Sequence, residues 1–356
     1  MTVLALDARG APLTPILGWR DTRSADAAEW LRRRLDADAV HARTGAYLHP
    51  SFWPAKLAWL AQAEPEVFRD AARFVSFSDV VRGGRTTSVS IASGTGLLDL
   101  TTNDWDAELL DTLGLDADRL PAIADEPVWL DGACSNLGAG CVGATRAALM
   151  VGTSGALRVL YETERPQPKP GLFLYRVDER RVIEGGALSD GGNLHAWLEA
   201  TLAEPGAASD DHGLTFLPFL GGERSTGWDP DMKGALLGLT FETSPGDIRR
   251  AALEGVGFRF AAIAELLPDV EEIVATGGAL LKDDTWVQLI ADALARPVAV
   301  SAVAEASLRG AAVAVLENAA PAPVGRTFHP REDRADEYRW ARERQERLYQ
   351  LLRGEL

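Results

Sequence analysis

Apolar residues recur at helical spacing in three segments of the first third of the chain. Ser24 stands where a helix cap is expected, and four apolar residues follow it at helical intervals. A proline suits the first turn of the second segment, and Gly114 would close the third. The three predicted helices cover Ser24–Leu35, Pro54–Ala63 and Trp105–Leu113.

The amino-terminal residues predict a β-hairpin. Val3–Leu6 is apolar, Asp7–Gly10 has the composition of a tight turn, and Pro12–Trp19 can return as an extended segment. Because no strand precedes this hairpin in the sequence, we expect an open sheet edge. An open edge favours pairing between copies, so a homodimer is one expectation.

The second half of the chain alternates strands, glycine turns and helices. Two strands are joined by the turn Gly152–Gly155, and the strand Glu271–Thr276 runs directly into Gly277, Gly278 and a helix that carries Trp286. This alternation indicates an α/β fold. Further helices are predicted over Asn193–Leu202, Pro245–Leu267 and Ala306–Glu317.

Length and composition indicate more than one domain. The chain has 356 residues, which exceeds one typical domain, and its composition shifts near Pro121–Pro127. We expect an amino-terminal domain over residues 1–123, a second domain over 124–330, and a charged surface helix over 331–356.

Charge and cysteine content restrict the class of protein. The formal net charge is −16 and is spread along the chain, whereas a general nucleic-acid role needs a basic surface. No apolar run is long enough to cross a bilayer, and the amino terminus does not resemble a signal peptide. Cys134 and Cys141 fit neither a zinc pattern nor a disulfide framework, so buried thiols are expected. These features predict a cytoplasmic protein that binds a small molecule.

One carboxylate is a candidate for acid–base chemistry. Asp131 precedes Gly132 and further small residues, which suit the start of a helix that packs closely against a neighbour. A carboxylate in this place can accept the proton of an attacking hydroxyl. It can equally be a plain helix cap, and the local sequence leaves both interpretations open.

Two glycine turns are candidates for phosphate or base binding. The backbone amides and hydroxyls of Gly152, Thr153, Ser154 and Gly155 could cradle phosphate oxygens, or the segment could be only a hairpin turn. Residues Gly277–Ala279 follow an apolar strand, where glycine lets the backbone approach a ligand closely. A tight strand-to-helix turn would explain the second motif equally well.

A dense polar cluster follows the first hairpin. Trp19, Asp21 and Arg23, with Arg20 between them, could hydrogen-bond the hydroxyls of a polyol while the indole stacks on a sugar face. A salt-bridged loop is the alternative.

Two other nucleotide-binding motifs are excluded. Gly138–Gly143 has the G-x-G-x-x-G spacing without a preceding strand or a following helix, and no P-loop sequence occurs.

The order of these segments resembles the FGGY family of carbohydrate kinases. Asp131 falls on the family's catalytic aspartate, VGTSG on its second phosphate-binding motif, and ATGGA on its adenosine motif. The stretch Arg43–Leu57 looks most like gluconokinases, with xylulokinases the near alternative. The similar segments are Pro12–Arg23, Ala92–Asp99, Leu130–Gly138, Val151–Gly155, Leu217–Gly227, Ala275–Ala279 and Ser307–Ala312.

The resemblance implies an actin-like, ribonuclease-H-like fold of two domains with a nucleotide cleft. The reaction would be transfer of the ATP γ-phosphoryl group to a sugar or sugar acid, with Mg²⁺ on the phosphates and Asp131 as general base. ATP would contact Gly152–Gly155 and Gly277–Ala279. The sugar would contact Trp19, Asp21, Arg23, Asp131 and Gly132.

The sequence also departs from the family pattern. Members normally open with a phosphate-holding hairpin and a histidine-bearing strand, and Met1 falls where the latter should be ending. The first domain is therefore expected to be incomplete. A catalytically weak or inactive nucleotide- or sugar-binding protein is the alternative to an active kinase.

Overall fold

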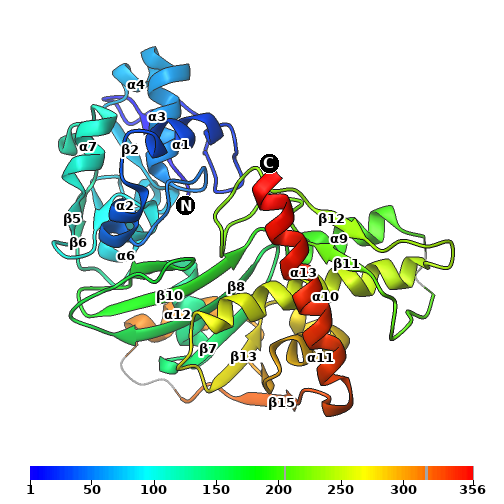
Figure 1. The fold of residues 1–356 in the computed structure, drawn as a ribbon. Helices are drawn as coiled ribbons and strands as arrows, with labels where there is room; N and C mark the ends of the chain where they lie inside the picture. Colours follow the sequence, from blue (N-terminus) through cyan, green and yellow to red (C-terminus); the bar gives the residue numbers. More distant parts are fainter. Residues whose placement is uncertain (204–205, 317–319, 356) are drawn as a thin grey trace. The chain divides into compact units, whose positions relative to one another are not determined.

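The computed structural model describes residues 1–203, 206–316 and 320–355, and the chain forms two compact units (Figure 1). The first unit comprises Met1–Ala133 and Tyr161–Glu184, and the second comprises Cys134–Leu160 and Gly185–Leu356. Among the residues that the structure describes, no helix is both long and apolar enough to cross a membrane.

The first unit combines short strands with helices. Its helices are α1 (Ala25–Arg32), α2 (Ala37–Thr44), α3 (Trp53–Ala63), α4 (Pro65–Asp70), α5 (Phe77–Val81), α6 (Val89–Thr95) and α7 (Ala107–Leu113). Its strands are β1 (Leu4–Leu6), β2 (Arg73–Val75), β3 (Thr86–Ser88), β4 (Leu98–Asp99), β5 (Asp104–Trp105), β6 (Ala122–Ala124) and β9 (Phe173–Arg176). The core of this unit packs α1, α3 and α7 around Leu31, Trp53 and Leu57.

The amino-terminal hairpin forms, but its first strand is not a sheet edge. β1 pairs antiparallel with β2 on one side, and bridges from Val3 to Leu17 and from Leu6 to Pro12 occupy the other. Main-chain groups of β1 therefore have partners on both sides. The open edge expected from the sequence does not lie on this strand, because β2 arrives from a segment about seventy residues later, which local patterning cannot reveal.

The capping role predicted for Ser24 is wrong in detail. The helix α1 begins at Ala25, but the Ser24 side chain accepts no hydrogen bond from its first turn. The hydroxyl instead donates to the carbonyl oxygen of Pro50 at 3.4 Å. A tertiary partner has replaced the local one.

The second unit is built on a mixed sheet. Its strands are β7 (Gly143–Val151), β8 (Gly155–Glu162, which ends in the first unit), β10 (Arg181–Leu188, which begins in the first unit), β11 (Thr215–Leu217), β12 (Ala235–Leu237), β13 (Glu272–Thr276), β14 (Val298–Ser301) and β15 (Val324–Phe328). The sheet order is β15-β14-β13-β7-β8-β10-β9, and β13 runs parallel to both β7 and β14. Its helices are α8 (Asp131–Gly138, which begins in the first unit), α9 (Gly192–Thr201), α10 (Pro245–Glu265), α11 (Asp284–Leu294), α12 (Ala306–Val315) and α13 (Ala335–Glu355).

The final helix lies on the surface with one buried face. Figure 1 shows α13 running beside α10 and α11, and it contacts both helices and β11. Tyr338, Gln345 and Tyr349 are buried on its inner face. Gln345 donates to the carbonyl oxygens of Phe216 and Gly255. Three residues spaced along this charged segment are therefore enough to dock one face of the helix.

Candidate functional site

The two glycine turns of the second unit lie at neighbouring strand ends. β7 ends at Val151 and β13 ends at Thr276, and because the strands are parallel and paired, both turns leave the same edge of the sheet. The amide of Ala279 donates to the carbonyl oxygen of Val151 at 3.2 Å. Gly277 has φ +91°, and a Cβ built there would lie 2.5 Å from the same carbonyl oxygen. Only glycine lets the turns approach this closely.

A third segment, which the sequence analysis missed, meets the Gly152–Gly155 turn. The amide of Gly192 donates to the carbonyl oxygen of Gly152 at 2.8 Å, and that of Asn193 donates to Thr153 at 3.0 Å. A Cβ on Gly191 would lie 2.8 Å from the carbonyl carbon of Ser154. The available signal was a glycine pair between a buried strand and a helix, β10 and α9. We call the three segments 152–155, 190–193 and 277–279 the glycine cradle.

The glycine cradle is open on one side. Thr153 and Gly278 are exposed, Gly152, Ser154, Gly277 and Ala279 are half-buried, and a Cβ on Gly278 would meet nothing within 4 Å. Backbone groups and small hydroxyls gathered at strand ends suit phosphate oxygens. The predicted helix does not start at the turn, however: a 3₁₀ turn at Leu280–Lys282 intervenes and α11 begins at Asp284.

Asp190 is the one carboxylate of the glycine cradle. Its side chain is 2% exposed and accepts a hydrogen bond from the amide of Gly221 at 3.3 Å. Within the described ranges, no three His, Cys, Asp or Glu side chains gather closely enough to hold a metal ion. Mg²⁺ typically keeps several waters and binds one or two carboxylates together with substrate phosphates. A cradle of main-chain groups with one adjacent carboxylate fits an ion of that kind.

Asp131 is the first residue of α8 and is exposed, with Gly132 half-buried beside it. The rest of α8 is anchored by small residues. A Cβ on Gly138 would overlap the carbonyl oxygen of Ala306, and one on Gly310 would overlap that of Cys134. Glycines therefore permit the close crossing of α8 and α12, and the expectation of tight packing behind Asp131 is confirmed.

The sugar-site candidates of the first unit lie on a turn and form one ion pair. The amide of Asp21 donates to the carbonyl oxygen of Gly18 at 3.1 Å. The guanidinium of Arg23 donates to both carboxylate oxygens of Asp21, and this contact lowers the pKa of Asp21. The Arg23 guanidinium also lies 4.7 Å from the ring centroid of Trp59 on α3. Of the predicted set, Trp19, Asp21 and Arg23 thus share one loop, and Arg23 lies against α3.

Lys56 is a second residue that the sequence analysis missed. It lies on α3, is 2% exposed, and its Nζ donates to the carbonyl oxygens of Asp21 at 3.0 Å and Pro50 at 2.5 Å. Burial lowers its pKa from the ordinary 10.5 to about 8. A lone lysine in an apolar helix gave no signal in the sequence.

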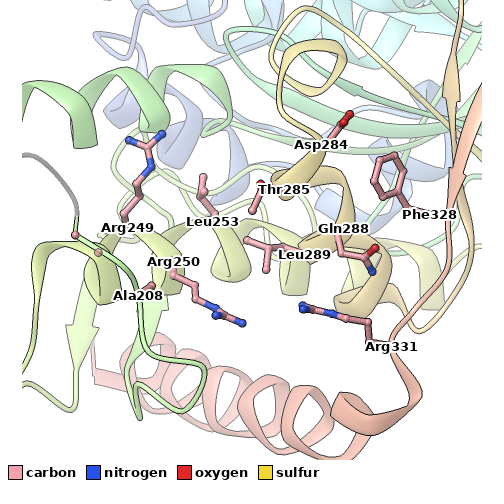
Figure 2. Close-up of a pocket in the computed structure, with 12 residues that line it drawn as sticks. Ala208, Arg249, Arg250, Leu253, Asp284, Thr285, Gln288, Leu289, Phe328 and Arg331 are labelled. Atoms are coloured by element: carbon pink, nitrogen blue, oxygen red, sulfur yellow. The ribbon is translucent and has the colours of Figure 1, made fainter.

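A pocket of about 630 Å³ lies between the amino-terminal halves of α10 and α11 (Figure 2). Leu253, Leu289 and Phe328 give it apolar walls, and Gln288 adds an amide. Arg250 and Arg331 extend toward each other across it. Both arginines already pair with acids: Arg250 with Glu254 and Asp210, and Arg331 with Asp292. Arg249, the third arginine of the lining, lies 3.9 Å from the carboxylate of Glu199. The pocket therefore combines apolar walls with arginines that each have an acidic partner.

The structure agrees with the exclusion of the Gly138–Gly143 motif. Gly138 ends α8 and Gly143 begins β7, so the G-x-G-x-x-G spacing lies between a helix and a strand rather than between a strand and a helix. Cys134 and Cys141 are buried and form no disulfide. Burial raises the pKa of the Cys141 thiol to about 12.

The whole chain except its last residues matches the two domains of a known protein family. The N-terminal domain of the FGGY family of carbohydrate kinases matches residues 1–153, and the family's C-terminal domain matches residues 147–316. The chain belongs to this family. It is accordingly a carbohydrate kinase with an α/β, actin-like fold, a phosphotransferase that acts on an alcohol group.

Several members of the family are similar to this chain over most of their length. A gluconokinase of Bacillus subtilis is 29% identical over 95% of this chain and 78% of its own length. A xylulose kinase of Escherichia coli is 28% identical over 81% of this chain and 67% of its own length. A glycerol kinase of Thermus brockianus is 31% identical over 85% of this chain and 70% of its own length. In structure, the gluconate kinase from Lactobacillus acidophilus has a TM-score of 0.86 at 27% identity, covering 99% of this chain and 82% of that one.

Proposed function

We propose that the protein transfers the γ-phosphoryl group of ATP to a hydroxyl of gluconate or xylulose, with Asp131 as general base. The observation that carries this proposal is the glycine cradle, because its close approach depends on the glycines of the phosphate and adenosine motifs. Similarity to proteins named gluconokinase and xylulose kinase supports the choice of acceptor.

The phosphates would lie on the glycine cradle. Thr153 and Ser154 would offer hydroxyls and amides, and Gly277, Gly278 and Ala279 would form the opposite wall. Mg²⁺, when bound with the nucleotide, would neutralise phosphate charge, and Asp190 is the carboxylate that could face it.

The pocket between α10 and α11 would take the nucleoside. One of the residues that line this pocket is Asp284, the first residue of the helix that follows the Gly277–Ala279 turn. The volume of the pocket is within the usual range for a small-molecule ligand. Since Arg250 and Arg331 are already paired, the apolar walls suit a neutral planar base. Phe328→Ala should raise the KM for ATP severalfold and leave the KM for the acceptor unchanged.

Asp131 would accept the proton of the attacking hydroxyl. An alcohol is a weak nucleophile, and a carboxylate within hydrogen-bond reach removes its proton as the new bond to phosphorus forms. The carboxylate is exposed and stands at the start of a helix fixed by close packing, so it can approach a bound sugar without losing its orientation. Trp19, Asp21, Arg23 and Gly132 would bind the remaining sugar atoms.

The test is ADP release measured with Mg²⁺-ATP and a panel of gluconate, xylulose, ribulose and glycerol. Asp131→Asn should lower the turnover number about 100-fold or more while retaining nucleotide binding. The matched control is Asp26→Asn, which changes another exposed aspartate in the first turn of a helix of the first unit. Full activity in Asp131→Asn would disprove the base assignment. ATP binding without turnover on any acceptor would indicate the binding-only protein instead.

A further inference from the structure

The 221–227 loop, which lies between β11 and β12, is hydrogen-bonded to the strand that delivers the third segment of the glycine cradle. The amide of Ser225 donates to the carbonyl oxygen of Ala187 on β10, and the amide of Ala187 donates to the Ser225 Oγ, each at 2.9 Å. Beyond the end of β10, the Asp190 carboxylate accepts from the amide of Gly221 at 3.3 Å. The loop therefore holds both the end of this strand and the one carboxylate of the glycine cradle.

A buried glutamate anchors the 221–227 loop to two helices. Glu223 is 1% exposed, and its Oε1 accepts from the amide of Gly227 at 3.0 Å and from the guanidinium of Arg259 on α10 at 3.3 Å. Its Oε2 accepts from the hydroxyl of Tyr349 on α13 at 3.0 Å. Burial raises the pKa of Glu223, whereas these donors favour the charged carboxylate.

The surroundings of this carboxylate are tightly packed. A Cβ on Gly227 would lie 2.2 Å from the Tyr349 hydroxyl oxygen and 2.4 Å from the Glu223 Oε2. The Arg259 guanidinium lies 4.4 Å from the Tyr349 ring centroid, and it also lies 3.5 Å from the carboxylate of Glu346. Because a close-packed interior transmits small displacements, the position of Tyr349 constrains that of the loop.

We propose that Glu223 is a positioning residue for phosphoryl transfer: bonded to Arg259 and Tyr349, it fixes the 221–227 loop and so holds Asp190 and the glycine cradle in the arrangement that binds the nucleotide phosphates. The inference rests on the proposed function, because it takes the glycine cradle as the phosphate site. It gives α13, which lies beyond the matched family domains, a role in nucleotide binding through a chain of hydrogen bonds.

The experiment measures binding of Mg²⁺-ATP without an acceptor, and of each acceptor without ATP, by calorimetry on the intact chain. Tyr349→Phe removes one hydroxyl and keeps the ring, so the packing around Arg259 is preserved. Loss of this hydrogen bond loosens the loop, and the variant should bind Mg²⁺-ATP about fivefold more weakly than wild type. Its affinity for gluconate and xylulose should be unchanged.

Tyr338→Phe is the matched control. Tyr338 is also buried on the inner face of α13, and its hydroxyl donates at 2.9 Å to the buried Glu254, which pairs with Arg250 of α10. Among the described residues, Glu254 has no hydrogen bond to the 221–227 loop, and Arg250 keeps both of its acidic partners in this variant. Tyr338→Phe should melt at a lower temperature, as Tyr349→Phe does, but bind Mg²⁺-ATP as wild type does. Equal nucleotide affinity of the two variants would overturn the inference.

Ser225→Ala tests the other end of the same chain of contacts. It removes the hydroxyl oxygen that accepts from the Ala187 amide and leaves Glu223 and its donors unchanged. This variant should also bind Mg²⁺-ATP more weakly and acceptors as wild type does. Wild-type affinity in both Ser225→Ala and Tyr349→Phe would refute this inference alone, whereas a wild-type chain that binds no Mg²⁺-ATP would refute the proposed function as well.

Discussion

The two candidate ligand sites are built from different parts of the polypeptide. The glycine cradle of the second unit consists of main chain held by main-chain hydrogen bonds, such as Ala279 to Val151. The sugar cluster of the first unit consists of side chains on a turn, held by the Lys56 ammonium and the Asp21–Arg23 ion pair. A main-chain site tolerates no added atom where backbones meet, as at Gly277, and its hydrogen bonds do not depend on pH, whereas a side-chain site tolerates substitution and depends on charge.

The largest effect is expected where a side chain cannot enter the glycine cradle. Gly277→Ala places a Cβ 2.5 Å from the carbonyl oxygen of Val151 at φ +91°. We expect a strain of roughly 1–3 kcal/mol and a loss of nucleotide affinity of at least tenfold. Titration with nucleotide in a calorimeter measures the loss of affinity, and thermal melting measures the strain.

Gly278→Ala is the control, because its Cβ would meet nothing within 4 Å. It should melt within a degree or two of wild type. If both alanine variants bind nucleotide as wild type does, the glycine cradle is not the nucleotide site.

An intermediate effect is expected from pH on Lys56. Its folded-state pKa is lowered to about 8, while the unfolded chain keeps the ordinary 10.5. Between these values the unfolded state binds more protons, so this residue makes stability rise with pH, by at most about 1.4 kcal/mol per pH unit. Melting temperatures from pH 7.5 to pH 10 should therefore rise for wild type relative to Lys56→Met.

Lys233→Met, at an exposed lysine, should leave that pH dependence as in wild type. A pH dependence shared by wild type and Lys56→Met would show that the Lys56 ammonium is not the buried charge inferred from its surroundings.

The smallest effect is expected at the Asp21–Arg23 ion pair. The Arg23 side chain is 53% exposed, so solvent screens the pair and Arg23→Gln should change the free energy of unfolding by less than about 1 kcal/mol. Because the pKa of Asp21 is lowered, the pair contributes stability above the unfolded value near 4 and loses it as pH falls further. Denaturant melts at pH 7 and pH 3 would show a smaller difference between variant and wild type at pH 3.

Elements with strong local signals were predicted well from the sequence. The strands around Gly152–Gly155 form the hairpin of β7 and β8, and α10 begins behind Ser244 with the reciprocal hydrogen bonds of a capping box. These signals are local because a turn or a cap depends on residues within three or four positions. The order of the family's segments along the chain likewise indicates the class of enzyme without any knowledge of tertiary contacts.

Long-range partners could not be predicted in the same way. Gly191 and Gly192 join the glycine cradle only because β10 delivers them beside Gly152, and Lys56 matters only because α3 brings it beneath Asp21 and Pro50. Along the sequence, none of these three residues differs from an ordinary turn glycine or helix lysine.

The family, the α/β fold and the local conformation around the candidate motifs can therefore be predicted from the residues alone. Tertiary structure alone decided which side chains share a site: Ser24 bonds to the Pro50 oxygen instead of capping its helix, and the buried Lys56 ammonium bonds to the carbonyl oxygen of Asp21. The physical reason is that hydrogen bonds and charges act over a few ångströms of space, which packing sets without regard to separation along the chain.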